Sequence, residues 1–181
     1  MANISRKWLD KRPFFCYDGM VFLEDNMVLN AQKPVVIIRH GKYSGNKLTQ
    51  LGVAEVTVTA QWLKEYVGED QVLVLYSPVA RAEETAKIVA EKVNGTLVPR
   101  TILNGEGGDW DEFQATMERL QRRPDVKLIV LVTHYDVVEL LIERFGQTSG
   151  APVDRRLRNA EALVLKNGAY MCYIPGVTYD N

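Results

Sequence analysis

The two histidines of the chain, His40 and His134, each stand at the end of a short apolar run. Arg39 precedes the first of them, and Arg81 follows shortly after a third apolar run. A neutral imidazole is a competent nucleophile, and guanidinium groups match phosphate oxygens with two parallel hydrogen bonds. These residue types therefore favour phosphoryl chemistry, provided that the fold brings them together.

The three apolar runs, 35–38, 72–76 and 128–132, predict the strands that position these residues. They are continuous and rich in β-branched residues, as in parallel strands that are buried on both faces. Ligands of such sheets bind beyond the carboxyl ends of the strands. Because parallel strands end at the same edge, we predict that Arg39, His40, Arg81 and His134 share one site.

Apolar residues spaced three or four positions apart predict helices between and after these runs. In a helix that starts near Thr49, one side carries Leu51, Ala54, Val58, Trp62 and Tyr66. A second helix carries Ala82, Thr85, Ala86, Val89 and Val93 and ends at Asn94-Gly95, and a third carries Phe113, Met117 and Leu120 and ends before Pro124. Asp136-Val-Val-Glu139 resembles a capping box for a fourth helix, with Gly146 past its end. The alternation predicts a three-layer α/β/α sandwich with a largely parallel central sheet.

Hairpins are predicted near both ends of the chain. Residues 161–165 and 170–174 flank Asn167-Gly168 and are expected to extend the sheet antiparallel at one edge. Within residues 1–34, Asp18-Gly19 indicates a weaker hairpin. We therefore divide the chain into an N-terminal extension, 1–34, whose role the sequence leaves open, and a catalytic domain, 35–181.

Length and charge exclude several classes of protein. The 181 residues fit one compact domain, and a formal net charge of −1 gives no indication of a nucleic-acid partner. Cys16 and Cys172 lie far apart and form no metal-binding or disulfide pattern. No segment has the length of a signal-peptide core or a membrane span. We expect a cytoplasmic protein with no membrane partner, and its oligomeric state stays open.

Four segments of the chain resemble the ordered motifs of the histidine phosphatase superfamily. They are Val35-Val-Ile-Ile-Arg39-His40-Gly41, Leu48-Thr49-Gln-Leu-Gly52, Ser77-Pro78-Val-Ala-Arg81-Ala82-Glu-Glu-Thr85-Ala86 and Val130-Leu-Val-Thr133-His134. The resemblance runs over residues 35–166 and implies the phosphoglycerate-mutase-like fold. It also implies that His40 is the phosphorylated nucleophile, that Arg39, Arg81 and His134 bind the phosphate, and that Asn46 assists them. It implies neither a metal nor another cofactor.

The segment from Arg81 to His134 has room for one helix and one loop. Mutases and the larger acid phosphatases carry insertions there, so the chain is more similar to SixA-type phosphohistidine phosphatases. This resemblance implies a hydrolase that acts through a phosphohistidine intermediate on His40. A phosphorylated small molecule and a phosphoprotein both remain possible substrates. A mutase is disfavoured, because nothing resembles a lid that would keep the phosphoenzyme from water.

The proton donor is the family feature that the chain matches least clearly. The resemblance implies an acid in the region Asn104-Gly-Glu106-Gly-Gly-Asp109, where Glu106 is the first candidate and Asp109 the second. The glycines around Glu106 suit a solvated loop equally well. Without such an acid, substrates with good leaving groups, phosphohistidine among them, would be favoured.

Other interpretations stay open at this point. His40 and His134 could bond backbone groups in the core, the arginines could pair with surface acids, and Asn46 could only end a turn with Gly45. The chain could also be a catalytically weak phosphate-binding or scaffold protein on the same fold. No GxxxxGK[ST] loop is present, and neither cysteine is followed by arginine six residues later, so P-loop and cysteine-phosphatase chemistry are excluded.

Overall fold

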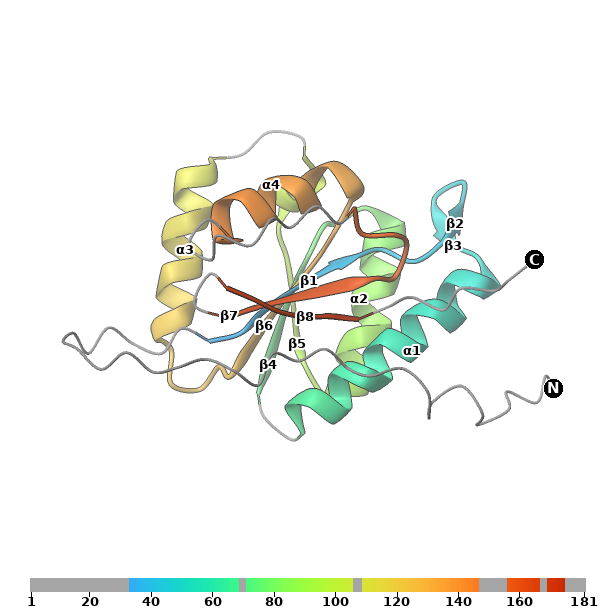
Figure 1. The fold of residues 1–181 in the computed structure, drawn as a ribbon. Coiled ribbons are helices and arrows are strands. Elements are labelled where there is room, and N and C mark those ends of the chain that lie inside the picture. Colours follow the sequence, from blue (N-terminus) through green and yellow to red (C-terminus); the bar gives the residue numbers. More distant parts are fainter. Residues whose placement is uncertain (1–32, 69–70, 106–108, 147–155, 167–168, 175–181) are drawn as a thin grey trace.

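A central sheet of six strands organises the computed structural model, which describes residues 33–68, 71–105, 109–146, 156–166 and 169–174 (Figure 1). The strands are β1 (Val35–Arg39), β4 (Val72–Tyr76), β5 (Thr96–Pro99), β6 (Leu128–Thr133), β7 (Ala162–Lys166) and β8 (Ala169–Ile174). Their order across the sheet is β5-β4-β6-β1-β7-β8. The first four run parallel, whereas β7 and β8 pair antiparallel at one edge. The predicted largely parallel sheet and its C-terminal hairpin are confirmed.

Helices cover both faces of the sheet, as the three-layer prediction requires (Figure 1). They are α1 (Gln50–Val67), α2 (Ala80–Val93), α3 (Trp110–Arg122) and α4 (Tyr135–Gly146), with a short 3-10 helix η2 (Thr101–Asn104) before α3. Val36 and Ile38 of β1 pack with α1 and α2, whereas Val35 and Ile37 pack with α3 and α4. Successive side chains of a strand alternate between faces, so two separate apolar cores hold β1 in place.

Helix α1 buries a different side from the apolar stripe noted in its sequence. Its buried residues are Gly52, Glu55, Val56, Thr59, Ala60 and Leu63. Val58 and Tyr66 of the stripe remain 45% and 41% exposed. The reason is close packing: a Cβ atom at Gly52 would lie 1.9 Å from the carbonyl oxygen of Lys42. Position 52 therefore has room only for glycine, and the side of α1 that contains Gly52 faces inward together with Val56 and Leu63.

The other helices follow the sequence pattern more closely. The predicted apolar residues of α2 and α3 are buried, and Asn94 ends α2 in the left-handed conformation. The fourth helix differs by about one residue at each end. It begins at Tyr135, so Asp136 lies inside the first turn, and Gly146 is its last residue. His134 occupies the cap position, because its carbonyl oxygen accepts a hydrogen bond from the amide of Val138.

Two elements were not predicted. Strand β5 extends the sheet beside β4, and a small hairpin of β2 (Tyr43–Ser44) and β3 (Lys47–Leu48) follows the first motif. Both are too short to show periodicity, although Gly45 has a φ of 60°, which suits glycine in a tight turn. The predicted hairpin around Asp18-Gly19 and most of the predicted extension lie outside the described residues.

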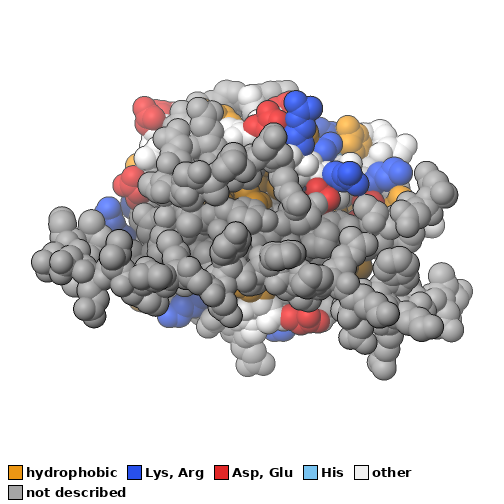
Figure 2. Space-filling model, viewed as in Figure 1, with side chains coloured by type: hydrophobic (Ala, Val, Ile, Leu, Met, Phe, Trp, Pro, Cys, Tyr) orange, Lys and Arg blue, Asp and Glu red, His pale blue; other side chains and the backbone are white. Residues whose placement is uncertain are grey.

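Charged side chains are intermixed on the face that Figure 2 shows. Lysine and arginine side chains lie among aspartate and glutamate along its upper edge. This distribution agrees with the formal net charge of −1. No helix in the described ranges is both long and apolar enough to cross a membrane.

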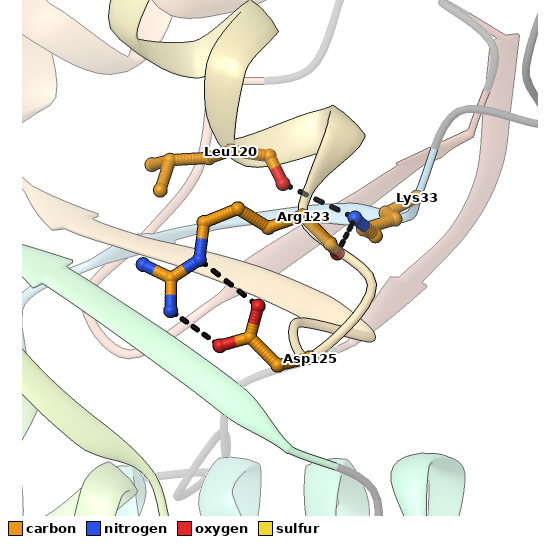
Figure 3. Close-up of polar contacts among 4 residues, drawn as sticks. All are labelled: Lys33, Leu120, Arg123 and Asp125. Atoms are coloured by element: carbon orange, nitrogen blue, oxygen red, sulfur yellow. Dashed lines mark hydrogen bonds and ion pairs between the residues drawn. The ribbon is translucent and has the colours of Figure 1, made fainter.

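Lys33 fixes the start of β1 to the end of α3 (Figure 3). Its ammonium group donates to the carbonyl oxygens of Leu120, Gln121 and Arg123 at the end of the helix. Arg123 in turn pairs with Asp125. A positive charge at a helix C-terminus also interacts favourably with the helix dipole. The amino end of β1 is thus held by a fully bonded polar cluster.

Candidate active site

Three neighbouring strand ends bring the two histidines together. Strand β6 lies between β1 and β4, and its end is aligned with theirs through hydrogen bonds from the His40 amide to the Thr133 carbonyl and from the Ser77 amide to the Val132 carbonyl. The ring centroids of His40 and His134 are 5.1 Å apart. The carboxyl edge of the sheet therefore holds both imidazoles at one place.

The hydrogen bonds of His40 define which ring nitrogen is free. Its Nδ1 lies 2.9 Å from the Gly41 carbonyl oxygen, which can only accept, so Nδ1 carries the proton. Its Nε2 accepts a hydrogen bond from Nε of Arg81 at 3.2 Å. In the neutral ring the lone pair is consequently on Nε2, directed at the arginine.

Arg81 connects His40 with the loop that follows it. Besides the bond to His40, its Nη1 lies 3.4 Å from Oδ1 of Asn46. The ring of Tyr43 lies against both partners: its centroid is 4.8 Å from the Arg81 guanidinium carbon and 4.9 Å from the His40 ring. The β2–β3 hairpin thus contributes Tyr43 and Asn46 to the rim beside the nucleophilic nitrogen.

Arg39 lies at the same carboxyl edge of the sheet. It directly precedes His40, so its side chain leaves the backbone on the opposite face of the sheet. Its Nη1 donates to the Leu157 carbonyl oxygen at 2.9 Å, and its guanidinium carbon lies 5.0 Å from the centre of the Tyr135 ring. Its Nε is buried and has no partner within the described chain. A buried donor without a partner is costly unless a ligand satisfies it.

His134 is held through its Nε2 atom. This nitrogen lies 2.8 Å from the hydroxyl oxygen of Ser77, and that hydroxyl donates to Oδ1 of Asn104 at 2.6 Å. The other ring nitrogen, Nδ1, is buried and has no partner within the described residues. Arg39 and His134 therefore each present one unsatisfied polar atom.

Both imidazoles are uncharged at neutral pH. Burial is the main cause that lowers the pKa of His40 to about 4, and the positive groups His134, Arg81 and Arg39 lower it further against the bond to Gly41. Burial likewise lowers the pKa of His134 to about 4, with Arg81 and Arg39 adding to the effect. Uncharged His40 keeps its Nε2 lone pair available at pH 7.

The backbone that carries His40 is fixed by two side chains that the sequence did not single out for this role. The Gly41 amide donates to the hydroxyl of Thr85 at 3.1 Å. Asn159 donates from Nδ2 to the His40 carbonyl oxygen at 3.1 Å. Gly41 itself has no room for a side chain, since a Cβ atom there would lie 2.7 Å from Val56. Thr85 belongs to the third motif, whereas nothing in the sequence marks Asn159.

The structure describes one of the two candidate proton donors. Glu106 lies outside the described residues. Asp109 caps α3, where its carboxylate accepts from the backbone amides of Asp111 at 2.9 Å and Glu112 at 3.1 Å. Its carboxylate is therefore engaged in capping the helix.

The assembled groups suit an anion with several oxygens. Arg39 and Arg81 form no ion pair with a carboxylate in the part of the chain that the structure describes. Their contacts are instead with a carbonyl oxygen, an amide, tyrosine rings and an imidazole. A phosphate dianion would satisfy the unpaired charge and the buried nitrogens. Over the same ranges, no group of three or more His, Cys, Asp or Glu side chains is arranged to hold a metal ion.

Known proteins with a similar fold include phosphatases and a mutase. No curated protein matches the sequence. Among solved structures, a putative phosphohistidine phosphatase SixA from Agrobacterium tumefaciens has a TM-score of 0.60 at 17% identity and covers 80% of this chain and 99% of its own. A Plasmodium falciparum phosphoglycerate mutase has a TM-score of 0.54 at 22% identity, covering 83% and 100%. A mycobacterial glucosyl-3-phosphoglycerate phosphatase, solved with VO3, has a TM-score of 0.56 at 15% identity, covering 78% and 96%.

These identities are low, so the likeness concerns the fold. The phosphoglycerate-mutase-like fold is confirmed by it. The family model of the histidine phosphatase superfamily (branch 1) matches residues 35–115, a range that contains the first three motifs and with them His40 and Arg81. By motif and by fold, the resemblance of this chain to the histidine phosphatase superfamily is confirmed.

Proposed function

We propose that the protein is a phosphatase in which His40 accepts the phosphoryl group of the substrate. The observation that carries this proposal is the state of His40: its Nδ1 proton is held by the Gly41 carbonyl, and its Nε2 lone pair is directed at Arg81. A nucleophile needs such a lone pair, and the adjacent guanidinium is a donor for phosphate oxygens. The family model and the phosphatases among the structural neighbours support the same activity.

In the first step, the phosphate binds between Arg39, Arg81 and His134, and displaces the contact between Arg81 and Nε2 of His40. The Nε2 lone pair forms a bond to phosphorus while the bond from phosphorus to the leaving group breaks. The leaving group departs with the bonding electrons and takes a proton from solvent. The arginines stabilise the charge on the oxygens of the transferring group, which is the main contribution expected of a protein in phosphoryl transfer.

In the second step, water attacks the phosphorus of phosphohistidine from the side opposite the ring. The bond between phosphorus and Nε2 breaks, inorganic phosphate leaves, and the lone pair returns to His40. Each step is a displacement at phosphorus that the cationic side chains alone can stabilise, so we propose a reaction without a metal ion. Asn46 assists by holding Arg81.

The substrate class follows from the leaving group. Asp109 is committed to capping α3, and Glu106 stays a prediction. A site without a strong proton donor favours leaving groups that need little assistance, such as the imidazole of a protein phosphohistidine, over alkyl alcohols. We therefore place phosphohistidine proteins first and phosphorylated small molecules second. SixA and the mycobacterial phosphatase act on one of these classes each, as their names state.

The test is metal-free hydrolysis of an activated aryl phosphate, together with detection of a phosphorylated enzyme after an alkaline quench. The wild type is expected to turn over in the presence of a chelator and to carry a phosphate that is labile in acid and stable in base. His40→Ala is expected to lose both signals, with kcat reduced by at least about 10³-fold.

A matched control removes the imidazole at the other histidine. His134→Ala keeps Nε2 of His40 and is expected to retain a slowly formed phosphoenzyme. Equal rates in the wild type and His40→Ala, or a phosphoenzyme in His40→Ala, would contradict the proposal. Phosphate binding without turnover in the wild type would instead favour the scaffold protein.

A further inference from the structure

Ser77 has more hydrogen-bond partners than any simple structural role requires. Its side chain is fully buried, and its hydroxyl oxygen lies near Nε2 of His134 at 2.8 Å, Oδ1 of Asn104 at 2.6 Å and the Val79 amide at 3.3 Å. A hydroxyl has one hydrogen to donate and two lone pairs that accept. The three partners therefore use all the hydrogen bonds that the hydroxyl can form, so each partner must act as either a donor or an acceptor.

For two of the partners, the type of group decides whether it donates or accepts. The Val79 amide can only donate, so it takes one lone pair of Ser77. The Asn104 carbonyl oxygen can only accept, so it takes the hydroxyl hydrogen. The remaining lone pair faces Nε2 of His134, which must then carry a hydrogen of its own. The lone pair of the neutral ring is left on Nδ1, the buried atom without a partner in the described chain.

We propose that Ser77 and Asn104 are positioning residues that hold His134 with its proton on Nε2, so that Nδ1 is open to the phosphoryl group. This inference rests on the proposed function, because it assigns to His134 a phosphate oxygen as its ligand. The two histidines are then held in opposite tautomers: the Gly41 carbonyl fixes the proton of His40 on Nδ1, and the Asn104–Ser77 pair fixes that of His134 on Nε2.

The arrangement has a consequence for phosphate binding. Burial is the main cause that favours the uncharged ring of His134, and the positive groups Arg81 of α2 and Arg39 of β1 add to it. His40 lies beside the ring, and Ser77 and Asn104 add no charge. A dianion between the arginines reverses that balance, so Nδ1 takes up a proton and donates it in a hydrogen bond to a phosphate oxygen. Binding of phosphate dianion is thus expected to consume one proton per site.

The tautomers can be read directly by NMR, because the chain has only two histidines. Long-range proton–nitrogen correlation of the free protein at pH 7.5 is expected to show one ring protonated at Nδ1 and the other at Nε2. His134→Gln removes one set of signals and assigns them. Two rings protonated at Nδ1 would overturn the inference, because the Asn104 amide would then be donating to Ser77 and Ser77 to His134.

Two substitutions at Asn104 separate positioning from packing. Asn104→Asp keeps an acceptor for the Ser77 hydroxyl, so the Nε2 proton of His134 and most of kcat are expected to remain. Asn104→Leu frees that hydroxyl to donate to His134, so the tautomer is expected to change and kcat to fall by about 10²-fold, as for a misplaced catalytic group. In Ser77→Ala, kcat is expected to fall by a similar factor.

Thr57→Val is the control for removing a hydroxyl group away from the site. The Thr57 hydroxyl is exposed and donates to the Val53 carbonyl oxygen within α1. The substitution is expected to leave tautomers and kcat unchanged. An unchanged His134 tautomer in Asn104→Leu would overturn the inference even if kcat fell. Calorimetry of phosphate or vanadate binding in buffers of different ionisation enthalpy measures the proton uptake, and no uptake would also overturn it.

Failure of the proposed function gives a different pattern. The tautomers and the proton uptake are measured without turnover, so they can be established in a protein that hydrolyses nothing. Absence of hydrolysis and of phosphoenzyme would count against the phosphatase, whereas equal tautomers in the two rings would count against the positioning.

Discussion

Positive side chains gather at both ends of strand β1, and the two clusters differ in what their charges meet. At the amino end, Lys33 donates to three carbonyl oxygens of the α3 terminus, and Arg123 pairs with Asp125. At the carboxyl end, Arg39 and Arg81 form no ion pair with a carboxylate in the described residues, and a guanidinium nitrogen of Arg39 is buried without a partner.

This difference is the one expected between a structural cluster and a cluster that binds an anion. Where cations are satisfied by the protein, their bonds contribute to stability and leave nothing for a ligand. Where they converge with their charge unbalanced, the folded chain carries a cost that an anion relieves on binding. The carboxyl end also holds two imidazoles whose pKa values are lowered mainly by burial and further by the positive charge of the two arginines. Both clusters are positively charged, so the sign of the charge does not distinguish them. They differ in whether the positive groups have partners within the protein.

The largest effect is expected when one arginine is replaced at the carboxyl end of β1, with an arginine at the amino end as the control. Arg81→Ala is expected to reduce kcat/KM for an aryl phosphate by about 10²-fold to 10³-fold, as loss of one preorganised donor does. Arg123→Ala is the matched control at the other end and is expected to leave kcat/KM unchanged. Steady-state kinetics checks both, and equal losses in the two variants would remove the distinction between the clusters.

The second effect concerns pH. The pKa values of His40 and His134 are lowered to about 4 from 6.5, so the unfolded chain binds protons that the folded protein does not. The free energy of unfolding is therefore expected to fall as the pH drops from about 6.5 towards about 4, and to be independent of these groups above that window.

Urea unfolding at pH 7.5, 6 and 5 measures this dependence. Arg123 lowers the pKa of Asp125 below its ordinary value of 3.8. The cluster at the amino end therefore does not contribute to the pH dependence of the free energy of unfolding in this pH window. His134→Gln is expected to flatten the dependence, and added phosphate is expected to raise the pKa of His134 in NMR titrations. An unchanged slope in His134→Gln would show that the positive field at this end is weaker than the contacts indicate.

The third effect is on stability alone. Lys33→Met keeps the length of the side chain and removes the donor to the α3 terminus, so it is expected to lower the free energy of unfolding by about 1 kcal/mol. Because this cluster is far from the site along β1, kcat/KM is expected to be unchanged. Denaturation and kinetics on the same sample check both statements, and a large loss of activity would contradict a purely structural role.

The smallest effect is expected at the exposed pair of Arg123 and Asp125. Surface ion pairs contribute little in water, because solvent screens them and the side chains lose freedom when they pair. Asp125→Asn is therefore expected to leave the thermal midpoint unchanged within error. A clear decrease would mean that Arg123 depends on this pair to keep its carbonyl oxygen aligned with Lys33.

Much of the fold was predictable because buried parallel strands have a recognisable composition. The runs that became β1, β4 and β6 are continuous and β-branched, and their order along the chain fixes which side chains stand at the carboxyl edge. The side of α1 that packs inward was not predictable in the same way. Two sides of α1 carry apolar residues, and the side that is buried with Val56 and Leu63 is the one on which Gly52 closely approaches the Lys42 carbonyl, a contact that the sequence does not announce.

The candidate site divides along a similar line. His40, Arg81 and His134 stand next to strand ends, so their sequence positions alone predict that they meet. Asn104 and Asn159 stand in segments without periodicity, so nothing local relates them to a histidine distant in the chain. Both act by hydrogen bonds that form only after the strands and helices have packed.

The sequence by itself thus determined which reactive groups lie at the edge of the sheet, since strand composition and chain order decide that. Only the tertiary structure decided the direction of each hydrogen bond: the Gly41 carbonyl selects the free nitrogen of His40, and Asn104 through Ser77 selects that of His134. The physical reason is that a tautomer depends on the donors and acceptors placed around the ring, and here these come from remote parts of the chain.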